Sequence, residues 1–361
     1  MKVGIIGAGW IADKMALTLS NLQSSSTVSA LQKAMGVKET GETLEKYAIA
    51  ARDYQRAKEF ADRMGFQKAY GSYQELVEDG EVELVYVATP HSHHLQHALL
   101  AINAGKHVLV EKAFTANTRE ALELLKAAED KGVFCMEAVW TRCMPLSHKV
   151  RELIDRDAVG TPEVLYASLC YDNEDKERIQ KPELCGGALL DLGVYSINFA
   201  RMYFGNGNSS MHSACIKGKS GVDLSETITM LWDDGKMANL QAGVLCWCNR
   251  MGMIAGRKGY LEVQNINCPE KVTLYHDYKP IETYFPPKEQ STGYEYEVLA
   301  CMDAIRDGKK ESPFMPHSET LEIMQLMDSL RKELHRKQYD IEHILISLLQ
   351  EYSVDLSNCH S

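Results

Sequence analysis

Three polar residues occupy positions from which they could move a proton. Lys112 follows the apolar run 107–110 and Glu111, and Asp191 and Tyr195 lie four residues apart. A spacing of four places two side chains on one face of a helix, one turn apart. Free tyrosine has a pKa of about 10 and is a poor base at neutral pH. A nearby buried ammonium, such as that of Lys112, would lower that pKa and stabilise a developing oxyanion, as the oxidation of an alcohol requires.

The same residues also have a structural interpretation. Tyr195 could pack as an amphipathic core residue, and Asp191 could cap a helix. The catalytic interpretation therefore depends on whether the chain also carries a motif that binds a redox cofactor.

A glycine-rich turn near the N-terminus is such a motif. Gly7-Ala8-Gly9-Trp10-Ile11-Ala12 directly follows the apolar run Val3–Ile6 and opens a helical pattern. In this GxGxxA form of the dinucleotide fingerprint, the first Gly permits the tight turn and the second lets the backbone approach the pyrophosphate. An ordinary glycine-rich turn is the alternative, but strand, helix and position agree. The sequence predicts a dinucleotide at the N-terminus of this helix.

The end of the second predicted strand bears on which dinucleotide is bound. A ribose with a free 2′-hydroxyl calls for an acidic residue there. The strand instead ends Ala51-Arg52-Asp53, and Arg56 lies one helical turn further on. A guanidinium at this place would pair with a 2′-phosphate, so we expect NADP to be preferred over NAD. In the alternative, Arg52 is merely exposed to solvent and Asp53 holds the ribose.

These residues are positioned by two kinds of element. Up to about residue 140, short apolar runs alternate with helical patterns, which is typical of a parallel sheet covered on both faces. Strands are expected at Val3–Ile6, Tyr47–Ala51, Leu84–Ala88, Val108–Val110 and Val133–Ala138, and helices at Ala12–Leu22, Gln55–Met64, Leu95–Asn103 and Thr118–Lys131. We predict a doubly wound α/β Rossmann domain over residues 1–139, with a probable insertion at 21–45.

The later part of the chain has longer, amphipathic strands, which predict a mostly antiparallel open sheet in an α+β domain over residues 140–338. Strands are expected at Glu163–Tyr171, Glu226–Trp232, Lys236–Cys246 and Lys271–Tyr275, and helices at Tyr294–Arg306 and Ser318–Arg336. Residues 339–361 form an extra tail with the amphipathic stretch Ile341–Leu349. The insertion and the tail could each bind a partner or pack on the fold.

The composition excludes several classes of protein. With 361 residues, 45% hydrophobic and 25% charged, the chain is long and apolar enough for two globular domains. A net charge of −11 argues against a nucleic-acid-binding surface. We find neither a membrane-spanning run nor a signal peptide, so we expect a cytoplasmic protein with reduced thiols. Cys246-Trp247-Cys248 would place two thiols on one face of a strand, which is weak support for a metal.

A group of histidines, His91, His93, His94 and His97, could suggest a metal site, because His93 and His97 are one helical turn apart. No convincing further ligands lie nearby in the sequence, so we expect no metal.

Five motifs occur in an order that resembles the Gfo/Idh/MocA oxidoreductases, the family of glucose–fructose oxidoreductase and inositol dehydrogenase. They are the glycine-rich turn, Thr89-Pro90-His91-Ser92-His93-His94, Asn103–Val108 with Glu111-Lys112-Ala113-Phe114, Glu137–Arg142 and Gly186–Tyr195. The resemblance covers about residues 1–335. It is strongest to the branch that contains dimeric dihydrodiol dehydrogenase and NADP-dependent D-xylose dehydrogenase.

The resemblance implies roles for single residues. Lys112 matches the lysine that contacts the substrate hydroxyl and the nicotinamide ribose, and Asp191 and Tyr195 match the pair beside the reacting carbon. The segment after Thr89 would lie along the cofactor. Its implied cofactor contacts are Thr89, Pro90, His91, His94, Glu111 and Lys112. Trp140 and Arg142 could line the substrate cleft, or instead pack between the domains and on the surface.

One residue departs from the family pattern, because Glu-Lys-Pro is Glu-Lys-Ala here. The loss of proline removes any preference for a cis bond before Ala113, so the position of Lys112 could differ from the family norm.

The resemblance implies a homodimeric or larger NAD(P)-dependent oxidoreductase that moves a hydride between nicotinamide and a sugar, polyol or cyclic diol. Two alternatives stay open at this point. A non-catalytic dinucleotide sensor could reuse the fold, although intact Lys112, Asp191 and Tyr195 argue against it. A lyase or hydrolase that uses the cofactor transiently would show no net change in the cofactor.

Overall fold

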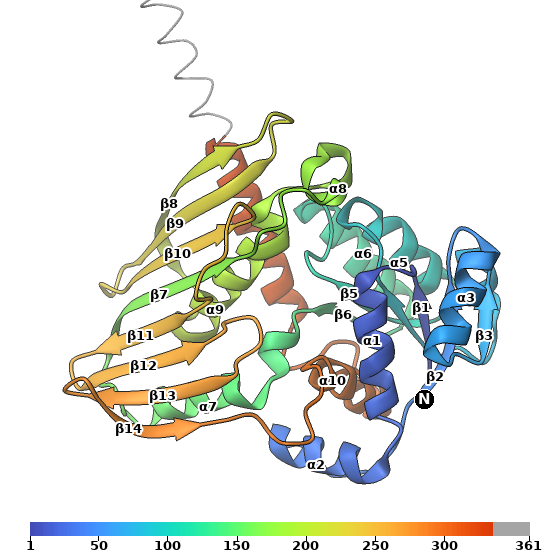
Figure 1. Cartoon of the computed structure of the whole chain (residues 1–361), viewed down its shortest axis with the longest axis horizontal. Coiled ribbons are helices and arrows are strands. Elements are labelled where there is room, and N and C mark those ends of the chain that lie inside the picture. The colour runs from blue at the N-terminus through green and yellow to red at the C-terminus, as the bar shows by residue number, and fades with distance from the viewer. Residues whose placement is uncertain (335–361) are drawn as a thin grey trace, which may run out of the picture.

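A computed structural model describes residues 1–334 of the chain, and the tail expected at residues 339–361 lies outside the described residues. Figure 1 shows two sheets, with the N-terminal one on the right and the C-terminal one on the left. Among the described residues, no helix combines the length and the apolar character needed to cross a membrane.

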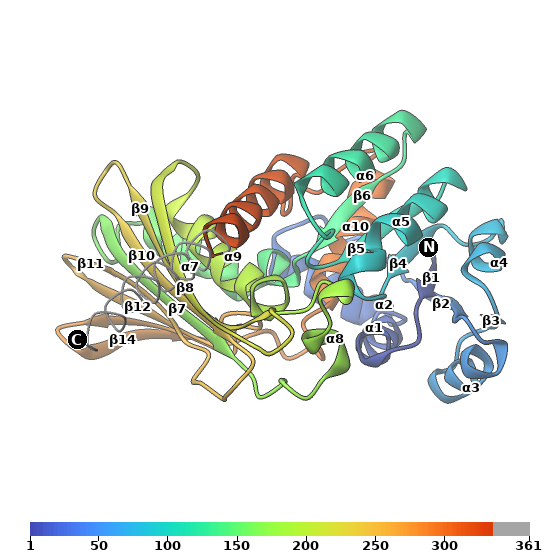
Figure 2. The ribbon, with the colours of Figure 1, turned by 90° about the horizontal axis from the view of Figure 1, so that it is seen from above.

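The first sheet has six parallel strands in the order β3-β2-β1-β4-β5-β6. The strands are β1 (Lys2–Ile6), β2 (Glu45–Ala50), β3 (Lys68–Tyr70), β4 (Leu84–Val87), β5 (His107–Glu111) and β6 (Cys135–Ala138). The helices are α1 (Trp10–Asn21), α3 (Tyr54–Met64), α4 (Tyr73–Glu78), α5 (His94–Asn103) and α6 (Thr118–Lys131). Figure 2 shows α5 and α6 on one face of the sheet and α1 on the other. This order confirms the predicted Rossmann fold.

The second sheet has eight strands in the order β14-β13-β12-β11-β7-β10-β9-β8. They are β7 (Pro162–Cys170), β8 (Asn208–Lys217), β9 (Asp223–Trp232), β10 (Met237–Gly243), β11 (Gly252–Gly256), β12 (Gly259–Gln264), β13 (Lys271–His276) and β14 (Lys279–Tyr284). Only the central pair of β7 and β10 is parallel, so the predicted mostly antiparallel sheet is confirmed.

One face of this second sheet is covered by helices. α9 (Val194–Phe204) packs on β7 and β10, and α7 (Pro145–Asp155) packs on β13. Along β9, buried residues alternate with less buried ones, as expected for a sheet with one face in the core. The opposite face therefore stays open as far as residues 1–334 are concerned.

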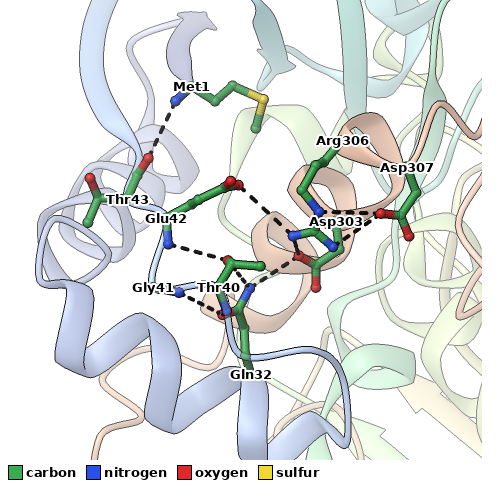
Figure 3. Close-up of polar contacts among 9 residues, drawn as sticks. All are labelled: Met1, Gln32, Thr40, Gly41, Glu42, Thr43, Asp303, Arg306 and Asp307. Carbon is green, nitrogen blue, oxygen red and sulfur yellow. Dashed lines mark hydrogen bonds and ion pairs between the residues drawn. The ribbon is translucent and has the colours of Figure 1, made fainter.

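The insertion at residues 21–45 is a packing element. It forms α2 (Ser25–Met35), which lies against α10 (Glu295–Arg306) from the far end of the chain. Figure 3 shows the polar contacts, in which the amide nitrogen of Gln32 donates to Asp303 Oδ1 at 3.1 Å. The same side chain's oxygen accepts from Thr40 N at 2.8 Å. The insertion thus joins the Rossmann fold to α10.

Several elements differ from the sequence-based expectations. The sequence analysis did not anticipate β3, α4, α7, β8, β11, β12 or β14. The strand expected at Lys236–Cys246 runs from Met237 to Gly243, so Cys246 and Cys248 lie in the following loop and the predicted strand placement of these thiols is wrong. The helix expected at Ser318–Arg336 covers residues 317–334 of the described chain.

Candidate active site

The glycine-rich turn joins β1 to α1 in the form that a pyrophosphate requires. Gly7 has φ +102°, and a Cβ there would lie 2.8 Å from the backbone oxygen of Ala88. Gly9 precedes α1 without a side-chain cap, and a Cβ there would meet no atom within 4 Å. The first N–H groups of α1 therefore remain free to hold a phosphate, so the residues present fit a dinucleotide.

The charged residues after β2 are arranged around this turn. Arg56 donates from its guanidinium to the backbone oxygen of Ala8 at 2.9 Å. Asp53 Oδ1 accepts from Arg56 N at 2.8 Å and caps α3. Arg52 is exposed beside them. The carboxylate of Asp53 is thus used by the helix, while the guanidinium of Arg56 contacts the turn.

Lys112 stands at the end of β5 and binds Asp191. Its Nζ donates to the backbone oxygen of Asp191 at 2.7 Å and to Oδ1 at 3.1 Å. Arg178, on the short helix α8 (Glu177–Gln180), lies 2.9 Å from Oδ1 and donates to Oδ2 at 3.1 Å. Burial alone would raise the pKa of Asp191, but the charges of Lys112 and Arg178 hold it well below its usual range. Asp191 is therefore a carboxylate shared by two cations.

Tyr195 faces the same lysine. The Nζ of Lys112 lies 5.1 Å from the centre of the Tyr195 ring. The phenol oxygen accepts a hydrogen bond from Trp140 Nε1 at 2.8 Å. Because indole only donates, the hydroxyl hydrogen of Tyr195 stays available for another acceptor. The predicted four-residue spacing therefore brings Asp191 and Tyr195 to the same ammonium group.

The pKa of Tyr195 differs from the sequence-based expectation. Burial, with smaller contributions from Tyr294 and Glu111, raises the pKa of Tyr195 well above its ordinary value. Lys112 does not reverse this shift because its ammonium is bound to Asp191. Tyr195 is thus a protonated phenol at neutral pH in the free protein.

A half-buried carboxylate, that of Asp223, lies at the start of the helix that carries Asp191 and Tyr195. Residues Leu189–Gly193 form a π-helix that continues into α9, a form often found at functional sites. Asp223 Oδ2 accepts from Leu189 N at 2.6 Å. Gly187 has φ +109°, and a Cβ there would lie 2.3 Å from Asp223 Oδ1. Because Gly187 has no side chain, the carboxylate of Asp223 has room to lie at the start of the helix.

The histidines that follow Thr89 tie loops together. His94 contacts the backbone oxygens of Ala113 at 2.9 Å and Thr89 at 2.8 Å. His91 Nδ1 lies 3.2 Å from the backbone oxygen of Cys185. Burial lowers the pKa of His91 to about 3 and that of His94 to about 4, so both are neutral. Within residues 1–334, no group of three or more His, Cys, Asp or Glu side chains is arranged to hold a metal.

The peptide bond between Lys112 and Ala113 is cis. Ala113 therefore follows a cis bond although it lacks the preference that proline would supply. Next to it, Glu111 accepts hydrogen bonds from the hydroxyl of Tyr86 and from Lys112 N, and its side chain is buried. Burial raises the pKa of Glu111.

Trp140 and Arg142 belong to one short turn, Trp140–Cys143, but contact different partners. Trp140 stacks on Tyr294 with ring centres 3.9 Å apart and reaches Tyr195 with its indole nitrogen. Arg142 donates to Asn198 at 2.5 Å and to Glu319 at 2.6 Å. Its guanidinium therefore joins α9 to the 317–334 helix, and we assign it no substrate contact.

Two residues of this site were missed by sequence reasoning. Arg178 lies in the polar segment 172–184, where alternating charges resemble an ordinary solvated loop. Tyr294 lies just before α10, about one hundred and fifty residues after the tryptophan on which it stacks. Neither carries a local pattern from which its contact could be predicted.

Comparison with known families places this geometry among oxidoreductases. A family model described as an oxidoreductase family with an NAD-binding Rossmann fold matches residues 1–139, and a GFO/IDH/MocA C-terminal domain model matches residues 147–262. The chain belongs to the Gfo/Idh/MocA oxidoreductase family. The predicted family is thereby confirmed.

This Gfo/Idh/MocA oxidoreductase has relatives with a defined activity in their names. It is 31% identical to trans-1,2-dihydrobenzene-1,2-diol dehydrogenase of Mus musculus, over 92% of this chain and 97% of that protein. It is 34% identical to the Danio rerio enzyme of the same name, over 80% of this chain and 88% of that protein. The resemblance to the dihydrodiol dehydrogenase branch is confirmed.

Solved structures share the fold at lower identity. An aldose–aldose oxidoreductase from Caulobacter crescentus has a TM-score of 0.79 at 18% identity, covering 93% of this chain and 98% of that chain. A 3-ketoreductase from Actinomadura kijaniata, solved with NADP, has a TM-score of 0.76 at 24% identity, covering 92% and 98%. Both matches extend over the Rossmann fold and the eight-stranded sheet.

Proposed function

We propose that this oxidoreductase is an NADP-preferring dehydrogenase or reductase that acts on a hydroxyl or carbonyl carbon of a sugar, polyol or cyclic diol. The observation that carries the proposal is the convergence of Lys112 and Tyr195, with the ammonium 5.1 Å from the phenol ring. The diol in the names of the relatives supports a substrate with neighbouring hydroxyl groups.

The residues that would hold the dinucleotide lie at the end of the first sheet. Its pyrophosphate would lie at the uncapped N–H groups of α1 beside Gly9, and a 2′-phosphate would meet Arg52 and Arg56. The use of Asp53 as a helix cap supports NADP over NAD. When bound, the nicotinamide supplies or accepts the hydride.

Tyr195 and Lys112 would manage the proton and the charge on the substrate oxygen. Because Tyr195 keeps its proton and does not donate it to Trp140, the phenol can donate it to a carbonyl oxygen that gains a hydride. Lys112 would stabilise the negative charge that develops on that oxygen. The high pKa of Tyr195 thus favours the general-acid role, which is the one needed for reduction.

A substrate panel tests this proposal. Absorbance at the reduced-nicotinamide band is followed with sugars, polyols and cyclic diols, each with NAD and NADP and in both directions. We expect turnover on at least one polyhydroxylated substrate, faster with NADP. Products formed without any net change in the cofactor would overturn it in favour of a lyase or hydrolase. Dinucleotide binding with no product from any substrate would favour a sensor.

We further propose a homodimer in the cytoplasm. The open face of the second sheet carries Val164 and Met237, which are directly paired across β7 and β10 and are 41% and 40% exposed. An apolar pair on an uncovered sheet face favours burial against a second copy. All cysteines among the described residues are free thiols, which supports a reducing compartment.

A further inference from the structure

Three thiols gather where β7 ends. Cys170 is the last residue of β7 and is 1% exposed. Cys248 lies in the loop that follows β10, and its sulfur accepts from Cys170 N at 3.1 Å and from Arg250 N at 3.3 Å. Cys246, two residues earlier, is exposed to solvent. A buried, a half-buried and an exposed thiol therefore share one corner of the sheet.

The sulfur of Cys248 lies directly against the backbone of Cys170. It accepts from Cys170 N at 3.1 Å and lies 4.0 Å from the carbonyl oxygen of the same residue. Burial, together with the thiols of Cys248 and Cys246, raises the pKa of Cys170 to about 12. Cys170 is thus a protonated thiol on a residue whose backbone contacts the sulfur of Cys248. Two thiols that can approach each other can be joined by oxidation to a disulfide.

The corner is connected to the candidate active site. Trp247, between the two loop cysteines, packs edge-on against Tyr171, with ring centres 5.9 Å apart. The hydroxyl of Tyr171 donates to Asn267 Oδ1 at 3.3 Å, and the backbone oxygen of Asn267 accepts from Thr141 Oγ1 at 2.7 Å. Thr141 follows Trp140, the hydrogen-bond partner of Tyr195. Cys170 directly precedes Tyr171, from which these contacts lead to the hydroxyl of Tyr195. A covalent change at Cys170 would therefore act next to the first residue of this series of contacts.

The corner is also distant from the proposed dimer surface. Val164 and Met237 lie near the starts of β7 and β10, whereas Cys170 pairs with Gly243 at the ends of the same strands. Six residues of extended strand separate the two places, which corresponds to roughly 20 Å. In a dimer formed through Val164 and Met237, the thiol corner would therefore lie away from the centre of the interface.

We propose that Cys170 and Cys248 form a reversible disulfide when the protein meets a hydroperoxide, and that this bond lowers turnover. In the first step the sulfur of Cys248 attacks one oxygen of hydrogen peroxide, the O–O bond breaks, and a sulfenic acid and one water form. In the second step the sulfur of Cys170 displaces that oxygen as a second water. The two thiols lose two hydrogens and two electrons, and peroxide is reduced to water.

Peptide mapping tests the disulfide without any assay of activity. The full-length reduced protein is treated with hydrogen peroxide, free thiols are alkylated, and peptides are analysed by mass spectrometry without reduction. We expect a peptide pair joined through Cys170 and Cys248, which dithiothreitol separates. Cys246→Ser should keep the cross-link, whereas Cys248→Ser and Cys170→Ser should abolish it. A cross-link through Cys246, or alkylation of both Cys170 and Cys248 after oxidation, would overturn the inference.

The effect on turnover rests on the proposed function and is measured separately. Peroxide should lower turnover severalfold in the wild type and in Cys246→Ser, and dithiothreitol should restore it. Cys248→Ser, whose fold is checked by its melting temperature, should resist the loss. A mapped cross-link with unchanged turnover would contradict the connection to the active site. A protein without any turnover would contradict the proposed function and leave the mapping result intact.

Discussion

At the scale of single residues, the ion pair between Lys112 and Asp191 controls the charge that a substrate meets. Lys112 and Arg178 both bind the same carboxylate, so the lysine is held in place but partly neutralised before a substrate arrives. A substrate oxygen that becomes negative would compete with Asp191 for the ammonium. Arg178 would then keep Asp191 paired, because it contacts both carboxylate oxygens.

The hydroxyl of Tyr195 gives the first prediction. Tyr195→Phe should lower kcat by about 10²–10⁴-fold, the usual contribution of a general acid–base group, and leave NADP affinity almost unchanged. The matched control is Tyr203→Phe, which removes a phenol from the same helix whose hydroxyl donates to Ser147 O at 3.2 Å. Steady-state kinetics and cofactor titration decide the matter. A near-normal kcat would assign the proton transfer to another group, such as His94 or Asp191.

The guanidinium of Arg52 gives the second prediction. Arg52→Asp should weaken NADP binding by about 10–100-fold, since a charge-assisted hydrogen bond contributes about 1.5–3 kcal/mol. NAD binding should change little or improve. Fluorescence titration of both dinucleotides is compared with Arg257→Asp, a control on the turn after β11 that is far from β2 in the fold. Tighter binding of NAD than of NADP by the wild type would refute the preference.

At the scale of elements, the helix that carries Asp191 and Tyr195 depends on a glycine. Gly187→Ala would bring a Cβ 2.3 Å from Asp223 Oδ1 at φ +109°. The matched control is Gly221→Ala, where φ is +85° but a Cβ meets nothing within 4 Å. Gly221→Ala should lower the free energy of unfolding by about 1–2 kcal/mol, because alanine is strained in a left-handed backbone conformation. Gly187→Ala should lower it further because of the clash. If urea denaturation gave the same decrease in the free energy of unfolding for both variants, the side chain of Asp223 would be able to move away from the new Cβ without cost.

The carboxylate of Asp223 should make stability depend on pH. Burial raises its pKa from 3.8 to about 6. The folded state therefore binds more protons than the unfolded state between these values, and the free energy of unfolding falls as pH rises from about 4 to about 6. The side chain of Asp223→Asn stays neutral and can still accept from Leu189 N. The variant should therefore not show the fall of about 3 kcal/mol in the free energy of unfolding that we expect for the wild type over this pH range.

Urea denaturation of both proteins from pH 4 to pH 7 measures this difference. Titrating groups that do not interact with Asp223 cancel when the two curves are subtracted. Glu226, whose pKa is raised in part by the charge of Asp223, contributes to the difference together with Asp223. A constant difference across the range would contradict the shifted pKa of Asp223.

The elements also show what sequence can and cannot reveal. The predicted helix Thr118–Lys131 agrees with the structure because Asn117 caps its start and Gly132 ends it, and both are local features. β3 has three residues, too few for a periodic pattern. Arg178 and Tyr294 enter the site through contacts between distant segments, so their roles depend on the tertiary fold.

At the scale of the whole molecule, the open sheet face gives the last prediction. Wild-type protein should be a dimer by light scattering at micromolar concentration, and Met237→Glu should shift it toward monomer, because a charge would face Val164 and the partner's surface. Tyr278→Glu is the control, since that side chain is 89% exposed on the β13–β14 turn. A dimer that Met237→Glu leaves intact would place the interface elsewhere.

The contact between α2 and α10 has a consequence for how the chain can fold. Gln32 and Asp303 are 271 residues apart in sequence, so the bond between them closes a very long loop. The outer strand β6 is likewise covered late, because Cys135 N donates to Lys310 O and Cys135 O contacts His317. During synthesis the N-terminal part is made first. At that stage, the surface of α2 on which α10 later packs and the edge of β6 are both uncovered. The residues up to His317 must therefore be synthesised before the edge of the first sheet is covered.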